Sequence, residues 1–192
     1  VLVSGGGTNL QALIDAQNNV LNSGSIELVI SNKENVYALE RAANFGIPGT
    51  VICKKDYESQ DAYDKALVEH FTEKGVGLIV LAGFLTILGK TFMDAFEGRI
   101  INVHPALIPS FCGKGYYGLR VHEEALKYGV KVTGATAHFV NEIPDGGKII
   151  MQKAVYIEDG DTPEVLQRRV MEQAEWIILP RAIDMIANGK IN

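Results

Sequence analysis

Short apolar runs alternate with amphipathic stretches along the whole chain. The apolar runs are rich in valine and isoleucine and have the length of β-strands; they cover residues 1–3, 26–30, 50–53, 78–81, 100–103, 133–140 and 149–156. Apolar positions at helical spacing predict helices between them, over residues 9–21, 36–45, 60–74, 86–96, 119–127 and 163–188. Strands that alternate with helices in this way are typical of an α/β protein.

The strands differ in how strictly their polar and apolar positions alternate. GLIVLAG, residues 77–83, is apolar on both faces, as expected for a strand that helices cover on both sides. The last two strands alternate more, and only NEIPDGGK, residues 141–148, separates them, which favours an antiparallel pair. We therefore predict one domain over residues 1–192 with a single doubly wound, mostly parallel, Rossmann-like sheet and an antiparallel edge formed by the C-terminal strands.

Composition narrows the expected partners and the expected compartment. The 192 residues are 47% hydrophobic and 21% charged, which is typical of a soluble globular protein. The net charge of -5 supplies no basic stripe for nucleic-acid phosphates, and no apolar run is long enough to span a bilayer, so we expect neither nucleic acid nor membrane as a partner. The only cysteines are Cys53 and Cys112, which favours a reducing compartment, and we expect the cytoplasm.

A glycine-rich turn joins the first strand to the first helix in VLVSGGGTNLQAL, residues 1–13. Glycines allow the backbone to approach a ligand, and the N-terminus of the following helix favours an anion. Gly7, Thr8 and Asn9 are therefore candidates for binding a phosphate monoester. Position 10 is leucine, so the GxGxxG pattern of dinucleotide sites is not met, and no P-loop lysine follows. A tight turn without a ligand explains the same pattern.

Asn102 and His104 end the fifth strand in INVHPALIPSF, residues 101–111. Alternation along a strand places their side chains on the same side, and two prolines stiffen the exit from the strand. An amide and an imidazole aimed at one point can stabilise an oxyanion in acyl transfer. The alternative is a strand end with ordinary hydrogen bonds, which is also how we interpret His70 and His122 on their predicted helices.

Asp145 lies on the loop between the last two strands, after His138 and before two glycines that allow a tight turn. A carboxylate next to an imidazole raises the pKa of the imidazole, so Asp145 is a candidate partner of His104. A plain turn residue is the alternative. The sequence contains neither a GxSxG nucleophile elbow nor the CxxC or HxxxH spacing of a metal site, which indicates direct transfer without a covalent step or a metal.

Five stretches, taken in order, resemble the folate-dependent phosphoribosylglycinamide formyltransferase family: VSGGGTNLQALIDA, SNKENVYALERAANFGIP, LAGFLTIL, INVHPALIPSF and GATAHFVNEIPDGG. The resemblance covers nearly the whole chain. It implies a single formyltransferase domain that transfers a formyl group from 10-formyltetrahydrofolate, its co-substrate, to the amine of 5′-phosphoribosylglycinamide in purine biosynthesis. It also implies small-molecule partners and a monomer or homodimer.

The resemblance assigns roles to individual residues. Asn102, His104 and Asp145 match the catalytic trio of the family, with His104 as an imidazolium and Asp145 as its partner and proton acceptor. Gly7, Thr8 and Asn9 match the phosphate loop, and Glu175 matches a glutamate that contacts the glycinamide substrate. The folate-binding positions are Gln60, Leu85, Thr86, Ile87, Leu88 and Val140.

Two positions and one loop depart from the best-known members of this family. Thr86 and Gln60 stand where those members often carry arginines, so positive charge is missing around the glutamyl tail of the folate. The loop at residues 111–118 is longer, and its Lys114, or Arg120 just beyond it, is a candidate to replace the lost charge.

Three other functions fit parts of the pattern. A methionyl-tRNA formyltransferase shares the Asn-x-His and Asp residues, but we expect a further C-terminal domain and a basic surface from it. A formyltetrahydrofolate hydrolase would use water as the acceptor and carry an added regulatory domain. A nucleotide-binding module without enzymatic activity would not need Asn102, His104 or Asp145.

Overall fold

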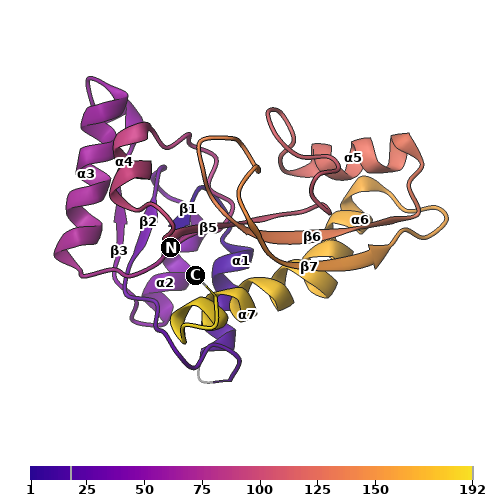
Figure 1. The fold of residues 1–192 in the computed structure, drawn as a ribbon, viewed down its shortest axis with the longest axis horizontal. Coiled ribbons are helices and arrows are strands. Elements are labelled where there is room, and N and C mark those ends of the chain that lie inside the picture. Colours follow the sequence, from indigo (N-terminus) through magenta and orange to yellow (C-terminus); the bar gives the residue numbers. More distant parts are fainter. Residues whose placement is uncertain (18, 192) are drawn as a thin grey trace. The chain divides into compact units, whose positions relative to one another are not determined.

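The computed structural model describes residues 1–17 and 19–191, and it divides into two compact units, Val1–Ile101 and Asn102–Asn192. Seven strands follow the hydrogen-bonded order β3-β2-β1-β4-β5-β6-β7, and β5, Ile100–His104, contains residues of both units (Figure 1). The predicted fold class, a mostly parallel sheet with an antiparallel C-terminal edge and flanking helices, is confirmed.

Unit 1 is built from short parallel strands that connect through helices. Its strands are β1, Leu2–Val3; β2, Val29–Ser31; β3, Gly49–Val51; and β4, Ile79–Leu81. β1 pairs in parallel with both β2 and β4, and β2 pairs in parallel with β3. The helical elements are α1, Thr8–Ala16; α2, Tyr37–Asn44; a 3-10 turn at Lys54–Asp56; α3, Gln60–Glu73; and α4, Lys90–Ala95. Parallel strands place all of their C-terminal ends at one edge of the sheet, where ligands bind in this fold class.

An N-terminal cap and a buried aromatic cluster position α3 and α4 in unit 1. Ser59 caps α3 by accepting a hydrogen bond from the backbone N–H of Ala62, at 3.1 Å. Phe71 of α3 packs edge-on against Phe92 and Phe96, with ring centroids 6.0 and 5.9 Å away. All three rings are buried, so this aromatic cluster anchors α4 to α3.

Unit 2 contains the antiparallel pair. β6, Val132–Phe139, pairs with β7, Ile149–Tyr156, and the register is interrupted by a bulge between Ala137 and His138. The helices are α5, Leu119–Tyr128; α6, Pro163–Val170; and α7, Trp176–Ala187, with a π-helical turn at Met171–Glu175 between the last two.

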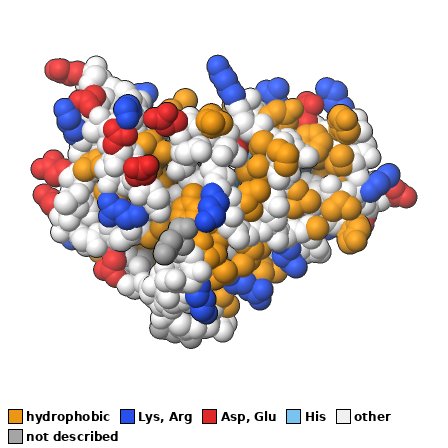
Figure 2. All heavy atoms as spheres, viewed as in Figure 1, with side chains coloured by type: hydrophobic (Ala, Val, Ile, Leu, Met, Phe, Trp, Pro, Cys, Tyr) orange, Lys and Arg blue, Asp and Glu red, His pale blue; other side chains and the backbone are white. Residues whose placement is uncertain are grey.

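The surface differs between the units. On the face that Figure 2 shows, charged side chains of both signs are scattered over unit 1, whereas hydrophobic side chains gather over β6 and β7 in unit 2. Val132, Ile149 and Tyr156 of these strands are exposed.

Three predicted helices differ from the structure. The helix expected at residues 86–96 begins only at Lys90, because residues 86–89 form an irregular loop that is hydrogen bonded to side chains of other segments, and Gly89 is extended. The helix expected at 163–188 is split by the π-helical turn. The helix expected at 9–21 ends at Ala16, because Gln17 is extended, and residue 18 of that prediction lies outside the described residues.

Candidate active site

β5 delivers Asn102 and His104 to its C-terminal end, as predicted. The His104 side chain is 4% exposed, and its Nε2–H donates a hydrogen bond to the backbone carbonyl of Phe111 at 2.8 Å. A carbonyl can only accept, so this contact assigns a proton to Nε2 and leaves Nδ1 as the ring nitrogen that gains or loses one.

Asp145 faces that second nitrogen. Its Oδ2 lies 3.5 Å from His104 Nδ1 and accepts the backbone N–H of Gly113 at 2.8 Å. Asp145 has a φ of 55°, in the left-handed region that few residues other than glycine adopt. The following turn passes close to β6, because a Cβ at Gly147 would lie 1.7 Å from the carbonyl oxygen of Phe139. The backbone therefore holds the carboxylate against His104.

His138 completes the site, and the sequence did not identify it as a member. Its Nδ1–H donates to the carbonyl of Phe139 at 2.8 Å, and its Nε2 accepts from the Asn102 amide at 3.2 Å. The same Nε2 lies 3.6 Å from Asp145 Oδ1. The register shift at His138 pairs it with Ile149 instead of Ile150, so the additional residue lies in β7, and such irregularities are common next to active sites.

Asn102, His138, Asp145 and His104 therefore form one connected chain, which we call the buried cluster. The structure brings the three predicted catalytic residues together, with Asn102 linked to the other two through His138. His138 stands on the same alternating face as Thr136, and the sequence marked it only as a histidine near a strand end. The backbone groups of Phe111 and Gly113 gave no sequence signal, because every residue type carries them.

The pKa values in the buried cluster reflect opposing effects of burial and of neighbouring charged and polar groups. Burial has the largest effect on the pKa of His104 and lowers it, and the charge of His138 lowers it as well. The Asp145 charge and the Phe111 carbonyl raise it, and the net pKa lies below the ordinary value. Asp145 raises the pKa of His104, as the sequence predicted, but the net shift of that pKa is downward. For Asp145 itself, burial raises the pKa, and interactions with His138, His104 and the Gly113 N–H together lower it below its ordinary value.

His122 lies on α5. The sequence suggested an ordinary histidine with satisfied hydrogen bonds, and the structure differs from that interpretation. Its side chain is fully buried, and neither ring nitrogen has a hydrogen-bond partner among the described residues. Burial, followed by the charge of His104, lowers its pKa to about 4. His122 is therefore a neutral imidazole near pH 7.

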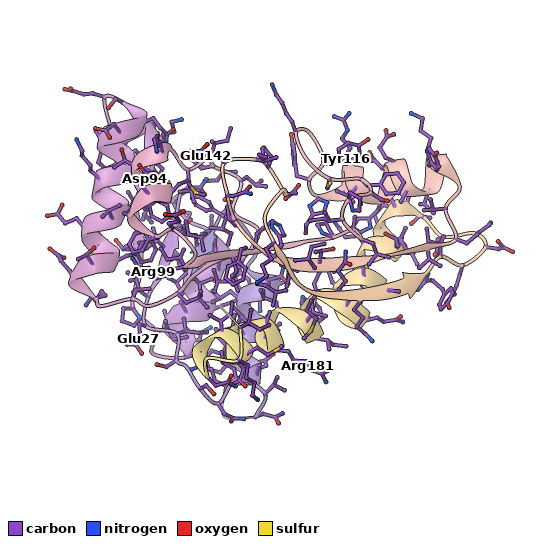
Figure 3. The ribbon with its side chains drawn as sticks, viewed as in Figure 1. Glu27, Asp94, Arg99, Tyr116, Glu142 and Arg181 are labelled. Carbon is purple, nitrogen blue, oxygen red and sulfur yellow. The ribbon has the colours of Figure 1, made fainter. Side chains whose placement is uncertain are left out.

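The longer loop at residues 111–118 supports the cluster through its backbone. Phe111 supplies the acceptor for His104, and Gly113 supplies the donor for Asp145. The ring of Phe111 packs edge-on against Tyr116 and Tyr128, with centroids 6.4 and 6.0 Å away. Figure 3 labels Tyr116 on this loop, before α5, and Arg120 lies 6.0 Å from its ring centroid. The loop is thus anchored by aromatic contacts.

The glycine loop lies in unit 1 at the N-terminus of α1. Gly7 is the N-cap residue, with a φ of 71°, and Thr8 and Asn9 form the first turn, where an anion is favoured. A Cβ at Gly7 would lie 2.7 Å from the Cβ of Ala38, whereas Gly5 and Gly6 face open space. Gly7 is therefore required for packing against α2.

Arg41 of α2 supports the glycine loop and was missed by the sequence. Its Nε donates to the carbonyl of Gly6 at 2.8 Å, and its Nη1 donates to Gln11 at 2.9 Å. Because these contacts join residues 35 and 30 positions apart in the chain, only the folded chain reveals them.

The predicted folate segment, residues 85–88, is an irregular loop in unit 1. Ser4 accepts the Leu85 N–H at 2.9 Å, Asn32 donates to Thr86 at 2.5 Å, and Gln60 donates to the Ile87 carbonyl at 3.3 Å. Leu85 and Ile87 themselves are 57% and 80% exposed. Side chains of other segments therefore hold residues 85–87 in place, while the side chains of Leu85 and Ile87 face solvent.

The remaining predicted residues lie in unit 2. Glu175 is the last residue of the π-helical turn and is 6% exposed. Val140 directly follows β6 and is half-buried. Among residues 1–17 and 19–191, no group of three or more His, Cys, Asp or Glu side chains is arranged to hold a metal ion. None of the described helices combines the length and apolar character needed to cross a membrane.

Comparison with known proteins places this chain in a family. The formyl transferase family model matches residues 1–183. The trifunctional purine biosynthetic protein adenosine-3 of Homo sapiens is 43% identical over 191 residues, covering 100% of this chain, which spans only 18% of the length of that relative. Phosphoribosylglycinamide formyltransferase of Escherichia coli K12 is 37% identical and is covered to 87% of its length by 100% of this chain.

A solved structure agrees with this placement. The crystal structure of glycinamide ribonucleotide transformylase 1 from Symbiobacterium toebii superposes with a TM-score of 0.92 at 40% identity, covering 100% of this chain and 87% of that one. The match extends over the segments that carry the buried cluster and the glycine loop. The resemblance drawn from the sequence is confirmed: the chain belongs to the formyl transferase family, among the phosphoribosylglycinamide formyltransferases.

Proposed function

We propose that this chain transfers the formyl group of 10-formyltetrahydrofolate to the amine of 5′-phosphoribosylglycinamide, as one formyltransferase domain of purine biosynthesis. The observation that carries the proposal is the buried cluster, in which a carboxylate, two imidazoles and an amide meet at the end of β5. Acyl transfer needs donors for a developing oxyanion and an acceptor for the proton of the nucleophile, and the cluster contains both.

In the proposed reaction the substrate amine attacks the formyl carbon and a tetrahedral oxyanion forms. Asn102 donates one amide N–H to His138, which leaves its second N–H for the oxyanion. His104 takes up a proton from solvent at Nδ1 as the oxyanion develops, donates a hydrogen bond to the oxyanion from that nitrogen, and returns the proton to solvent when the intermediate collapses. The net pKa of His104 lies below its ordinary value, so the developing negative charge itself favours protonation at that nitrogen.

Asp145 is the proposed proton acceptor. The lowered pKa of its carboxyl keeps it ionised near neutral pH, so it can take the amine proton, directly or through a water. The intermediate collapses as the bond from the formyl carbon to N10 of the folate breaks. The proton taken from the amine reaches N10, and the products are the formylated amide and tetrahydrofolate.

Binding roles follow from the loops. We assign the substrate phosphate to Gly7, Thr8 and Asn9, and the glycinamide group to Glu175. We assign the folate ring system to residues 85–88, where exposed Leu85 and Ile87 offer apolar surface, with Gln60 and Val140 as further contacts. The proposal needs no metal and includes a cytoplasmic location and a monomer or homodimer.

The test is to incubate the purified protein with 10-formyltetrahydrofolate and each acceptor separately: phosphoribosylglycinamide, water alone, and methionyl-tRNA. Formation of formylated glycinamide ribonucleotide with stoichiometric tetrahydrofolate is the expected result. Release of formate in water would instead indicate a hydrolase. Ligand binding without turnover would indicate a binding module, and would remove Asn102, His104 and Asp145 from a catalytic role.

A further inference from the structure

The glycine loop, to which the substrate phosphate is assigned, has no charged side chain of its own. Gly7, Thr8 and Asn9 are all neutral residues. A phosphate monoester carries about 1.5 to 2 negative charges near pH 7, whereas the N-terminus of a helix offers only about half a positive charge. A further source of positive charge is therefore expected beside this loop.

Arg41 of α2 brings a positive charge to the loop. Its Nε donates to the Gly6 carbonyl at 2.8 Å, and its Nη1 donates to Gln11 Oε1 at 2.9 Å. A Cβ at Gly7 would lie 3.5 Å from the Cδ of Arg41, so the arginine side chain runs alongside the start of α1. Both hydrogen-bond acceptors are neutral groups, so neither cancels the charge of the guanidinium.

Neighbouring groups hold the Arg41 guanidinium in place. Its central carbon lies 4.6 Å from the centroid of the Tyr37 ring, one turn earlier on the same helix. Gln11 donates to Asp15 at 2.8 Å, which orients the Gln11 amide so that its oxygen faces Arg41. α1 and α2 also share one buried hydrophobic cluster, so the helix that carries Arg41 is fixed relative to the loop.

The carbonyl groups of the loop face α2. The Gly5 carbonyl accepts the backbone N–H of Ala38 at 3.1 Å, and the Gly6 carbonyl accepts the Arg41 Nε–H. In a trans peptide unit the N–H points opposite to the C=O, so the N–H groups of Gly6 and Gly7 point away from α2. The space around Gly5 and Gly6 is open, because a Cβ added to either would meet no atom within 4 Å. Successive N–H groups of this kind favour an anion.

We propose that Arg41 makes the glycine loop select a phosphorylated formyl acceptor over its dephosphorylated form. Its positive charge attracts the phosphate, and its hydrogen bond to Gly6 holds the peptide unit that directs the Gly7 N–H toward the anion. The inference rests on the proposed function, because that function assigns the phosphate to Gly7, Thr8 and Asn9. Arg41 is thus a specificity-determining residue of the binding step and not a catalytic residue.

The experiment measures, by titration calorimetry, the dissociation constants of phosphoribosylglycinamide and of its dephosphorylated form, glycinamide ribonucleoside. The wild-type protein should bind the phosphorylated form more tightly, and Arg41→Gln should reduce the ratio of the two constants about tenfold, because a charged hydrogen-bond donor is lost. The dissociation constant of the ribonucleoside should stay close to its wild-type value. Arg41→Lys keeps the charge but lacks the planar set of donors, so it should reduce the ratio by only about threefold.

Arg99→Gln is the matched control. Arg99 also lies in unit 1, between α4 and β5, and is labelled in Figure 3. It donates to the backbone carbonyl of Ala95 at 2.6 Å, and its guanidinium carbon lies 5.0 Å from the ring centroid of Phe96. The control therefore removes the same charge and the same kinds of contact at another place, and it should keep the wild-type ratio.

The outcomes separate this inference from the proposed function. A wild-type ratio near one, or an unchanged ratio in Arg41→Gln, overturns the inference even if formyl transfer proceeds. Equal weakening of both forms would leave Arg41 with a structural role only, and an equal loss in Arg99→Gln would show a general charge effect; either result contradicts the inference. If Arg41→Gln does not fold, the ratio in Arg41→Lys decides.

Absence of formyl transfer by the wild-type protein would overturn the proposed function and leave the inference open to a second probe. Inorganic phosphate, titrated by phosphorus NMR, should bind more weakly to Arg41→Gln than to the wild type and to Arg99→Gln. Equal binding by all three proteins, or no binding to the wild type, would show that Arg41 does not serve a phosphate site.

Discussion

The buried cluster of unit 2 and a surface pocket of unit 1, lined by Lys33, Lys54, Lys55 and Glu34 among others, use charge in opposite ways. His104 and His138 are almost inaccessible and Asp145 is 14% exposed, whereas Lys55 and Glu34 in the pocket are mostly exposed. Burial raises the free-energy cost of each charge in the cluster and makes the pKa of each group depend strongly on its neighbours. Solvent weakens each charge in the pocket, so that only several together hold a ligand. The buried cluster is therefore suited to catalysis, and the exposed pocket is suited to adaptable binding.

The largest effect should come from the cluster. His104→Ala removes an oxyanion donor and should lower kcat by about two to three powers of ten, with little change in the substrate dissociation constants. Steady-state kinetics and calorimetry measure the two quantities separately. His70→Ala, on α3 of unit 1, is the matched control and should retain wild-type turnover. Near-normal turnover of His104→Ala would remove His104 from the mechanism.

Asp145→Asn tests the electrostatic coupling inside the cluster. Loss of the proton acceptor should lower kcat by about two powers of ten. An anion stabilises the protonated imidazole, so neutralising Asp145 should lower the pKa of His104 further below its ordinary value. The His104 titration followed by NMR, in wild type and variant without added substrates, measures this shift. A midpoint that stays constant or rises would leave Asp145 as a turn residue only.

His122 should make the folded protein sensitive to acid. Its pKa falls from 6.5 in the unfolded chain to about 4 in the folded protein, so its stabilising contribution is complete above pH 6.5 and is lost as the pH falls toward 4. The full loss corresponds to about 3 kcal/mol. Urea unfolding of wild type and His122→Leu between pH 7.5 and 4 should show a shallower decline for the variant. Parallel curves would contradict the predicted titration.

Gly7 tests whether the glycine loop of unit 1 depends on packing rather than on charge. Gly7→Ala combines a positive φ with a Cβ that would lie 2.7 Å from the Cβ of Ala38, and should lower the free energy of unfolding by about 2 kcal/mol. Gly6→Ala meets open space and should leave the melting temperature unchanged. Gly7→Val cannot serve as a pure test of phosphate binding, because it would disturb the contact with α2. Equal melting temperatures for both alanine variants would show that α2 moves to accommodate the side chain.

Two errors in interpreting the sequence share one cause, because each depends on how distant segments pack around a residue. Residues 86–89 have helical spacing, but hydrogen bonds with the side chains of Asn32, Gln60 and Asp64 hold them in an irregular loop. His122 has the spacing of an ordinary helical histidine, but it is buried without hydrogen-bond partners among the described residues. Local periodicity does not report which distant groups will meet a segment.

Local physical chemistry determined the alternation of strands and helices, the class of sheet and the antiparallel edge, because periodicity and turn residues act over a few positions. It also identified Asn102, His104 and Asp145 as candidates, since strand alternation and the fold class predict which loops bind ligands. Only the tertiary structure decided that His138 joins them, that backbone groups of residues 111 and 113 hold His104 and Asp145, and that three lysines share one pocket. These contacts join residues far apart in the chain, and burial, which sets the pKa of each group, exists only once those segments pack.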